Sequence, residues 1–307
     1  MRKYIFYFLF AACLFFGHEA SAAKHKRAYI PNPPYAAILV DAGTGNIIYQ
    51  TNSDLPRYPA SLTKMMTLYL TFEALENGKL SMNQNLRVSE HAASQAKVTL
   101  NLQPGDRISV KDAILSLVVK SANDSAVVLG ESVGGDEEDF AAAMTRKARQ
   151  LGMNHTTFEN ASGLYDDQQK STARDLAKLV IALQRDFPQY YPLFSRTSFT
   201  YRGQVYLGHN KVTKIYKGCD GVKTGFLRAS GFNLASSAVR GGRRIVGVVL
   251  GGKTAAARDR KMMQLLDYAF TTLKQRGQKL ATGKKTHKSS AIPAGSLASQ
   301  TLSNLGI

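Results

Sequence analysis

The stretch from Tyr58 to Lys64 holds a serine and a lysine at a spacing that suits nucleophilic catalysis. Ser61 stands just after a proline, where a helix should begin, and Lys64 follows three residues later. Side chains at i and i+3 share one face of a helix, so the lysine amine should lie beside the serine hydroxyl. A neutral amine there could take the serine proton, and the free N–H groups of the helix start would favour a bound oxyanion. By itself, however, a Ser-x-x-Lys tetrapeptide is more often an ordinary helix start.

Two further short motifs change that interpretation. Lys120-Ser121-Ala122-Asn123 places a Ser-x-Asn between two expected helices, and Lys223-Thr224-Gly225 lies on an expected short strand. Each tripeptide alone is common. The order Ser-x-x-Lys, Ser-x-Asn, Lys-Thr-Gly, with intervals of about 60 and about 100 residues, is the set found in class A β-lactamases and penicillin-binding proteins.

On these motifs the sequence resembles the serine-type D-alanyl-D-alanine carboxypeptidases, which are low-molecular-mass penicillin-binding proteins. The resemblance extends over about residues 33–273 and includes the phrases Gly163-Leu164-Tyr165 and Asp220-Gly221-Val222. It implies a β-lactamase/DD-peptidase-like fold. It also implies a substrate, the peptidoglycan stem peptide ending in D-Ala-D-Ala, and covalent inhibition by β-lactam antibiotics.

The catalytic roles can be assigned by residue type. Ser61 is expected to attack the carbonyl between the two D-alanines and to form an acyl-enzyme. Lys64 must be neutral to act as the base, and burial together with a neighbouring Lys223 ammonium would lower its pKa. Ser121 would relay a proton to the leaving amine, while the Asn123 side chain would bond the substrate amide and hold the Lys64 amine.

Substrate binding is expected from the Lys-Thr-Gly strand. Lys223 would supply positive charge and Thr224 a hydroxyl for the substrate carboxylate, and Gly225 would let the substrate backbone approach the strand edge. The resemblance implies that the backbone N–H of Phe226 joins that of Ser61 in an oxyanion hole. It also implies that Arg258 helps to bind the terminal carboxylate, against the alternative of a solvated arginine at a helix start.

Other reactive residue types do not form a pattern. His209 could line the cleft, but a lone histidine is more often structural. Cys219 is expected to be a small packed residue. Since no His/Cys/Asp cluster has metal spacing and no glycine-rich phosphate loop occurs, we expect neither a metal nor another cofactor.

The order of the helices and strands that we expect around these residues predicts an α+β fold. We expect an antiparallel sheet built from an N-terminal hairpin and three C-terminal strands, with a closing helix across it and a mostly helical subdomain inserted at about residues 80–195. The helix after Ser61 is apolar on most faces and should be buried at the seam. The expected strands and closing helix are residues 36–50 for the hairpin, then 220–226, 231–239, 243–250 and 256–273.

Both ends of the 307-residue chain differ from this middle part. Arg2 and Lys3 precede an apolar run, and Ala20-Ser21-Ala22 is a small-x-small site, so residues 1–22 are expected to be a signal peptide. Residues 23–276 would form the catalytic domain, and residues 277–307 a basic, disordered tail. We therefore expect export to the periplasm, with weak contact to the wall or to an anionic membrane surface. The formal charge of +18 does not suggest nucleic acid in that compartment.

Three rival functions remain on the sequence. A DD-endopeptidase, which cuts peptidoglycan cross-links, would need the same residues and a different cleft shape. A class A β-lactamase would need a glutamate that positions the deacylating water, and no Glu-x-x-Leu-Asn phrase occurs between Asn123 and Lys223. The motif residues are all intact, which argues against a wall-binding protein without catalysis.

Overall fold

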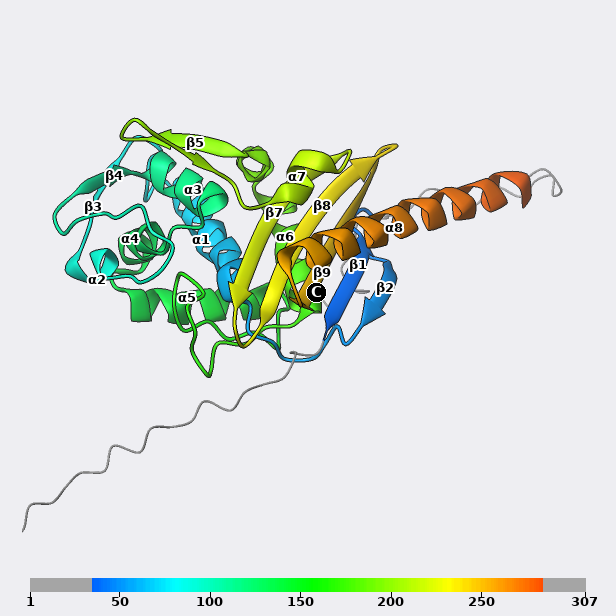
Figure 1. Ribbon diagram of the computed structural model, residues 1–307, viewed down its shortest axis with the longest axis horizontal. Coiled ribbons are helices and arrows are strands. Elements are labelled where there is room, and N and C mark those ends of the chain that lie inside the picture. Colours follow the sequence, from blue (N-terminus) through cyan, green and yellow to red (C-terminus); the bar gives the residue numbers. More distant parts are fainter. Residues whose placement is uncertain (1–34, 284–307) are drawn as a thin grey trace, which may run out of the picture. The chain divides into compact units, whose positions relative to one another are not determined.

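One antiparallel sheet joins strands from the two ends of the described chain, which a computed structural model defines for residues 35–283. Its five strands lie in the order β2-β1-β9-β8-β7 (Figure 1). Ala36 pairs with Leu250 and Asp41 with Ile245, so the first strand lies beside the last. The expected sheet is confirmed. The strands are β1 (Ala36–Asp41), β2 (Ile47–Thr51), β7 (Cys219–Leu227), β8 (Gly231–Arg240) and β9 (Arg243–Gly252).

The apolar runs of β1 and β9 are explained by cores on both faces of the sheet. Side chains alternate between the two faces of a strand. Ile38 and Val248 belong to the larger apolar cluster on the helical side, while Leu39 and Val249 belong to a second cluster. This second cluster includes Met262 of α8 (Ala255–Gly283), the closing helix that crosses the sheet (Figure 1).

Helix α6 (Ala173–Asp186) covers the opposite face of the sheet, where it contacts β1, β8 and β9. Its residues fall within the range expected for the helical insertion, so the insertion is shorter than the sequence predicted. The reason is the apolar stripe Leu176, Leu179, Val180 and Leu183, which has the spacing of one helix face and is buried. Thr172 caps this helix by accepting a hydrogen bond from the Asp175 N–H.

A second group of helices surrounds α1 (Lys64–Glu76). This helix is buried along most of its length and contacts α3, α4, α5 and α6. A helix that is apolar nearly all round was expected to be buried, and this is confirmed. Two short strands pair beside this group. These elements are α2 (Glu90–Ala93), α3 (Val110–Val119), α4 (Asn123–Gly134), α5 (Glu137–Gln150), β3 (Asn85–Arg87) and β4 (Arg107–Ser109).

A small hairpin before the Lys-Thr-Gly strand was not expected. It consists of β5 (Ser198–Tyr201) and β6 (Gln204–Leu207), and it follows the short helix η2 (Tyr191–Ser195). Both turn residues, Arg202 and Gly203, have positive φ, as a tight two-residue hairpin requires. The Arg-Gly pair lacks the usual Asn or Asp, which explains why the turn was missed. Helix α7 (Lys211–Ile215) then leads towards β7.

The closing helix is longer than the sequence predicted, since α8 continues through Gly283 and takes in the first residues expected in the basic tail. Glutamine, arginine, lysine, leucine and alanine dominate this extension, and all of them have good helix propensity. The rest of the expected tail, residues 284–307, and the expected signal peptide, residues 1–22, lie outside the described residues. None of the helices between residues 35 and 283 has the length and apolar character needed to cross a membrane.

Candidate active site

Ser61 lies in a 3-10 turn, η1 (Ala60–Thr63), that runs directly into α1. The turn is tied to the sheet, because the Asn233 side-chain amide on β8 donates to the carbonyls of Tyr58 and Pro59 at 3.1 and 3.3 Å. A Cβ atom on Gly225 of β7 would lie only 3.1 Å from the Ser61 nitrogen. The serine backbone therefore packs directly against the Lys-Thr-Gly strand.

Lys64 is fully buried and meets three oxygen atoms. Its Nζ lies 3.4 Å from Ser61 Oγ, 2.7 Å from Asn123 Oδ1 and 2.5 Å from the Ser162 carbonyl oxygen. An ammonium group could donate to all three. A neutral amine could donate only to Asn123 and Ser162, which would leave its lone pair for the serine hydroxyl.

The electrostatic surroundings favour that neutral form. Burial holds the pKa of Lys64 well below its usual value, and the neighbouring Lys223 lowers this pKa further. The carboxylates of Asp124 and Glu137 act in the opposite direction. The buried amine is therefore under two opposing influences, of which desolvation is the larger.

Ser121 and Asn123 sit in the junction between α3 and α4. Ser121 has a φ of +66°, a conformation that a non-glycine residue adopts at a cost. The junction is held from outside, because the Asn123 N–H donates to the Val98 carbonyl at 2.7 Å and its side-chain amide donates to the Ala96 carbonyl at 2.9 Å. These bonds orient Asn123 Oδ1 towards Lys64.

Lys223 approaches the same junction from β7. Its Nζ donates to Ser121 Oγ at 2.9 Å and to the Thr224 carbonyl at 3.0 Å. Burial, with a smaller contribution from the charge of Arg258, lowers the pKa of Lys223 to about 7. The two lysines are thus joined through the Ser121–Asn123 junction, and both lie out of solvent.

Side chains alternate along the rest of the motif strand. Lys223 and Gly225 are buried, and Gly225 packs on the serine turn, whereas Thr224 is half-buried and Phe226 is exposed. The ring of Phe226 is 51% exposed and packs 4.3 Å, between centroids, from Phe232. Gly225 was expected to let a substrate backbone approach the strand edge. The structure gives it another constraint, the serine turn, where an added Cβ would crowd Leu62, Ser61 and Ala60.

Arg258 is a buried residue near the start of α8 and not a solvated arginine. Its Nη1 donates to the Asn233 carbonyl at 2.8 Å, and its Nε donates to Asp259 Oδ1 at 2.9 Å. These donors are directed at protein acceptors, so Arg258 influences Lys223 through its charge.

His209 and Cys219 lie on either side of α7. Burial and the charges of Lys223 and Lys120 lower the pKa of His209. Cys219 donates from its thiol to the Gly221 carbonyl at 3.2 Å, and burial raises its pKa. The Cys219 side chain therefore stays a protonated, packed thiol, as its residue type suggested.

The Gly163-Leu164-Tyr165 phrase was recognised, but the role of the Ser162 carbonyl next to it was missed because this contribution comes from the backbone. The Ser162 carbonyl accepts from Lys64, and Gly163 passes so close to the serine turn that a Cβ on it would lie 2.0 Å from the Ala60 oxygen. Only the glycine could have been a signal, since its φ of +81° excludes most other residues. A backbone acceptor has no sequence signature.

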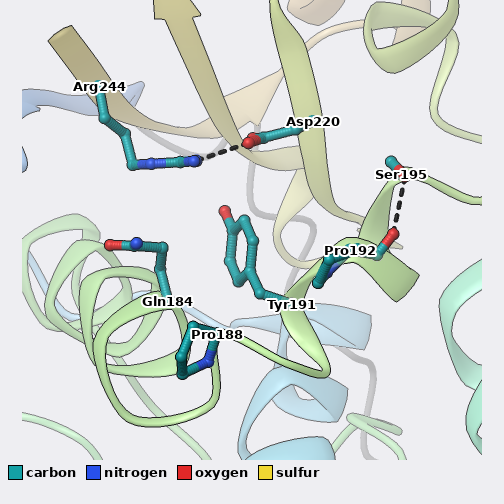
Figure 2. A pocket seen from close by; sticks show the side chains of 7 residues that line it. All are labelled: Gln184, Pro188, Tyr191, Pro192, Ser195, Asp220 and Arg244. Carbon is teal, nitrogen blue, oxygen red and sulfur yellow. Dashed lines mark hydrogen bonds and ion pairs between the residues drawn. The ribbon is translucent and has the colours of Figure 1, made fainter. Parts of the chain in front are cut away.

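A pocket of about 250 Å³ at the beginning of β7 contains none of the expected site residues (Figure 2). Within it, Arg244 donates to Asp220 at 2.7 Å and also bonds the Ser237 hydroxyl. Because Asp220 is three residues before Lys223, this ion pair helps to fix the start of the motif strand. The pocket is lined by Gln184, Pro188, Tyr191, Pro192, Ser195, Asp220 and Arg244.

Known structures share this fold. Penicillin-binding protein 5 from Haemophilus influenzae aligns with a TM-score of 0.75 at 31% identity, over 78% of this chain and 72% of that one. Penicillin-binding protein D2 from Listeria monocytogenes, solved in an ampicillin-bound form, aligns with a TM-score of 0.68 at 32% identity, over 76% of this chain and 96% of that one. The fold therefore defines the class, that of the β-lactamase/DD-peptidase-like penicillin-binding proteins.

The family can be stated as well. The chain belongs to the D-alanyl-D-alanine carboxypeptidase family, whose sequence profile matches residues 32–254. D-alanyl-D-alanine carboxypeptidase DacF of Bacillus subtilis is 34% identical over 245 residues, which cover 77% of this chain and 62% of that relative. The chain thus spans somewhat less than two thirds of that relative's length. In the part of the chain that the structure describes, no group of three or more His, Cys, Asp or Glu side chains could hold a metal ion.

Proposed function

We propose that this protein is a serine-type D-Ala-D-Ala carboxypeptidase that removes the terminal D-alanine of peptidoglycan stem pentapeptides. The observation that carries the proposal is the buried Lys64 amine, which lies 3.4 Å from the Ser61 hydroxyl in surroundings that lower its pKa. Membership of the carboxypeptidase family supports the choice of substrate.

In the acylation step, the neutral Lys64 amine donates hydrogen bonds to Asn123 and Ser162 and accepts the proton of Ser61 on its lone pair. The serine oxygen attacks the carbonyl carbon between the two D-alanines. The carbonyl electron pair moves to oxygen, where the N–H groups of Ser61 and Phe226 bind it. Such donors typically stabilise a transition state by about 3 kcal/mol each.

Collapse of this intermediate requires a proton for the leaving nitrogen. Ser121 Oγ, which lies 2.9 Å from Lys223 Nζ, passes its proton to the amine of the departing D-alanine as the C–N bond breaks. The Lys64 ammonium then returns a proton to Ser121, which requires these two side chains to come into contact once the substrate is bound. Water then attacks the ester with Lys64 again as base, and the shortened peptide leaves Ser61 in its original form.

Recognition of the substrate depends on the β7 edge. The Lys223 ammonium and the Thr224 hydroxyl bind the terminal carboxylate, and the peptide backbone extends along the strand as an added strand. The buried Arg258 adds positive charge next to Lys223. A β-lactam would present its carboxylate and its strained amide to the same groups, so penicillins should acylate Ser61 and block it.

The place of action follows from the substrate. Peptidoglycan lies outside the cytoplasmic membrane, and the expected signal peptide would send the protein to the periplasm. The excess of positive charge favours weak contact with wall polymer or with an anionic membrane surface.

The test of this function is D-alanine release from a peptide that ends in D-Ala-D-Ala. Release by the wild-type protein, and none by Ser61→Ala, is the expected result. Equal thermal unfolding temperatures would show that both proteins are folded. A folded wild type that releases no D-alanine but cleaves cross-linked muropeptides would instead be a DD-endopeptidase.

The pH dependence of kcat/KM should be bell-shaped. On the alkaline side Lys223, whose pKa is lowered to about 7, loses the proton that attracts the substrate carboxylate, so kcat/KM falls as the pH rises through about 7. On the acid side Lys64 gains a proton and ceases to be a base. In Lys223→Arg the guanidinium stays charged, so the alkaline fall near neutral pH should disappear. An unchanged alkaline limb in that variant would contradict the assignment.

A further inference from the structure

Glu137 connects the surface of the helical group to the segment that touches Lys64. It lies in the first turn of α5, and its side chain is only 14% exposed. One carboxylate oxygen accepts a hydrogen bond from the Ala161 N–H at 2.9 Å. The other lies 2.5 Å from Nε2 of His91 on α2. A carboxylate in the first turn of a helix is commonly explained by its favourable interaction with the helix dipole. The Glu137 carboxylate, however, also bonds two residues outside α5.

The Ala161–Ser162 segment is held on its other side by α1. The Ala161 carbonyl accepts from the Thr67 hydroxyl at 2.6 Å, and the Ser162 carbonyl accepts from Lys64 Nζ at 2.5 Å. The three successive peptide units from Asn160 to Gly163 are thus each held by a hydrogen bond to Glu137, Thr67 or Lys64. The bond from Glu137 to Ala161 therefore helps to place the Ser162 oxygen near the Lys64 amine, together with the bond that the Gly163 N–H donates to Asn160 Oδ1 at 2.7 Å.

Glu137 also acts on Lys64 through its charge. Besides burial, three charged groups act on the pKa of Lys64: Lys223 on β7 lowers it, whereas Asp124 on α4 and Glu137 on α5 raise it. The Asp124 carboxylate accepts from the N–H groups of Leu100 and Leu102, so its place is fixed by another loop. Only Glu137 combines this charge with a bond to the segment that contacts the amine.

We propose that Glu137 is a positioning residue for the reaction, which holds the Ser162 carbonyl against Lys64 and sets the charge balance around the amine. The inference rests on the proposed role of Lys64 as the base. His91 is the titratable group that faces Glu137, and a proton on it would offset part of the Glu137 charge.

Two substitutions separate the bond from the charge. Glu137→Gln keeps an oxygen that can accept from Ala161 but removes the charge, so Lys64 should deprotonate at lower pH. The acid limb of the acylation rate should then move down by about half a pH unit or more. Glu137→Asp keeps the charge but is one methylene shorter. Its acid limb should move less, while its maximal rate should fall about ten-fold because the carbonyl is displaced.

The experiment follows acylation by a fluorescent penicillin as a function of pH for the full chain and these variants. Glu138→Gln is the matched control, since it removes an exposed charge from the same turn, and it should leave the profile unchanged. A Glu137→Gln profile that coincides with that of the wild type would overturn the proposal. So would a Glu137→Asp rate equal to the wild-type rate.

A second readout separates this inference from the proposed function. The titration of Lys64 can be followed by NMR in protein labelled with 15N-lysine and free of any substrate, with Lys64→Arg used to assign the signal. Glu137→Gln should shift this titration to lower pH even in a protein that fails to acylate. A wild type that acylates, with no shift in Glu137→Gln, would remove the role of Glu137 and leave the carboxypeptidase assignment intact.

Discussion

Lys64→Arg should reduce acylation of Ser61 to the background that Ser61→Ala leaves, although it keeps a positive charge at the same place. Arginine stays protonated at any pH that a protein tolerates, so it cannot accept the serine proton. General-base catalysis typically contributes a factor of about 100 to 10,000. The measurement is the rate of labelling by a fluorescent penicillin, with the thermal unfolding temperature as a check on folding.

Lys178→Arg is the matched control for this experiment. Lys178 of α6 is also buried, and its Nζ donates to the Gly152 carbonyl at 2.5 Å. Replacing this lysine by arginine changes the side-chain volume and the shape of the charged group in the same way, but at a site away from the Ser61 hydroxyl. We expect labelling at the wild-type rate in this control. Rapid labelling of Lys64→Arg would show that another group takes the serine proton.

Gly163→Ala should damage both stability and activity. Its φ of +81° is unfavourable for alanine, and the new Cβ would lie 2.0 Å from the Ala60 oxygen, which belongs to the turn that carries Ser61. Neither backbone can yield without moving the serine. We expect a loss of about 4 kcal/mol or more in the free energy of unfolding. The surviving folded protein should show about 100-fold slower acylation, since a small displacement of the nucleophile is costly.

Gly105→Ala isolates the steric part of that effect. Gly105 has a φ of +84°, nearly the same as Gly163, but nothing lies within 4 Å of the position of its Cβ. It should lose only the backbone strain, about 1–2 kcal/mol, and should acylate normally. Chemical denaturation of the two variants gives the comparison. Equal losses would mean that the contact with Ala60 relaxes without cost.

The composition of the sheet was predictable because several signals agreed, whereas the order of its strands was not predicted. The apolar runs of β1 and β9, the Gly241-Gly242 turn between β8 and β9, and the amphipathic closing helix all indicated the same layer. The β5–β6 hairpin could not be found, since its four-residue strands are short and its Arg-Gly turn is atypical. The place of α6 depends on tertiary packing, which the local pattern of Leu176 and Val180 does not reveal.

The sequence predicted those parts of the site that consist of motif side chains. The structure brings the motif residues together in two hydrogen-bonded groups, Ser61–Lys64–Asn123 and Ser121–Lys223, which meet at the short segment from Ser121 to Asn123. Backbone groups and supporting charges had no such signature. The Ser162 carbonyl and the Glu137 carboxylate act on Lys64 from positions about 100 and about 70 residues away in the chain, which spacing rules do not cover.

The pairing of Ala36 with Leu250 has a consequence for how the chain acquires its structure. During synthesis β1 must wait for β9, because β9 is its neighbour in the sheet and leaves the ribosome more than 200 residues later. Until then β1 has only the β2 hairpin, and a two-stranded hairpin is marginally stable. Contacts so distant along the chain slow folding, since a long loop must close before they form. The catalytic group, which needs β7 against the serine turn, therefore forms late.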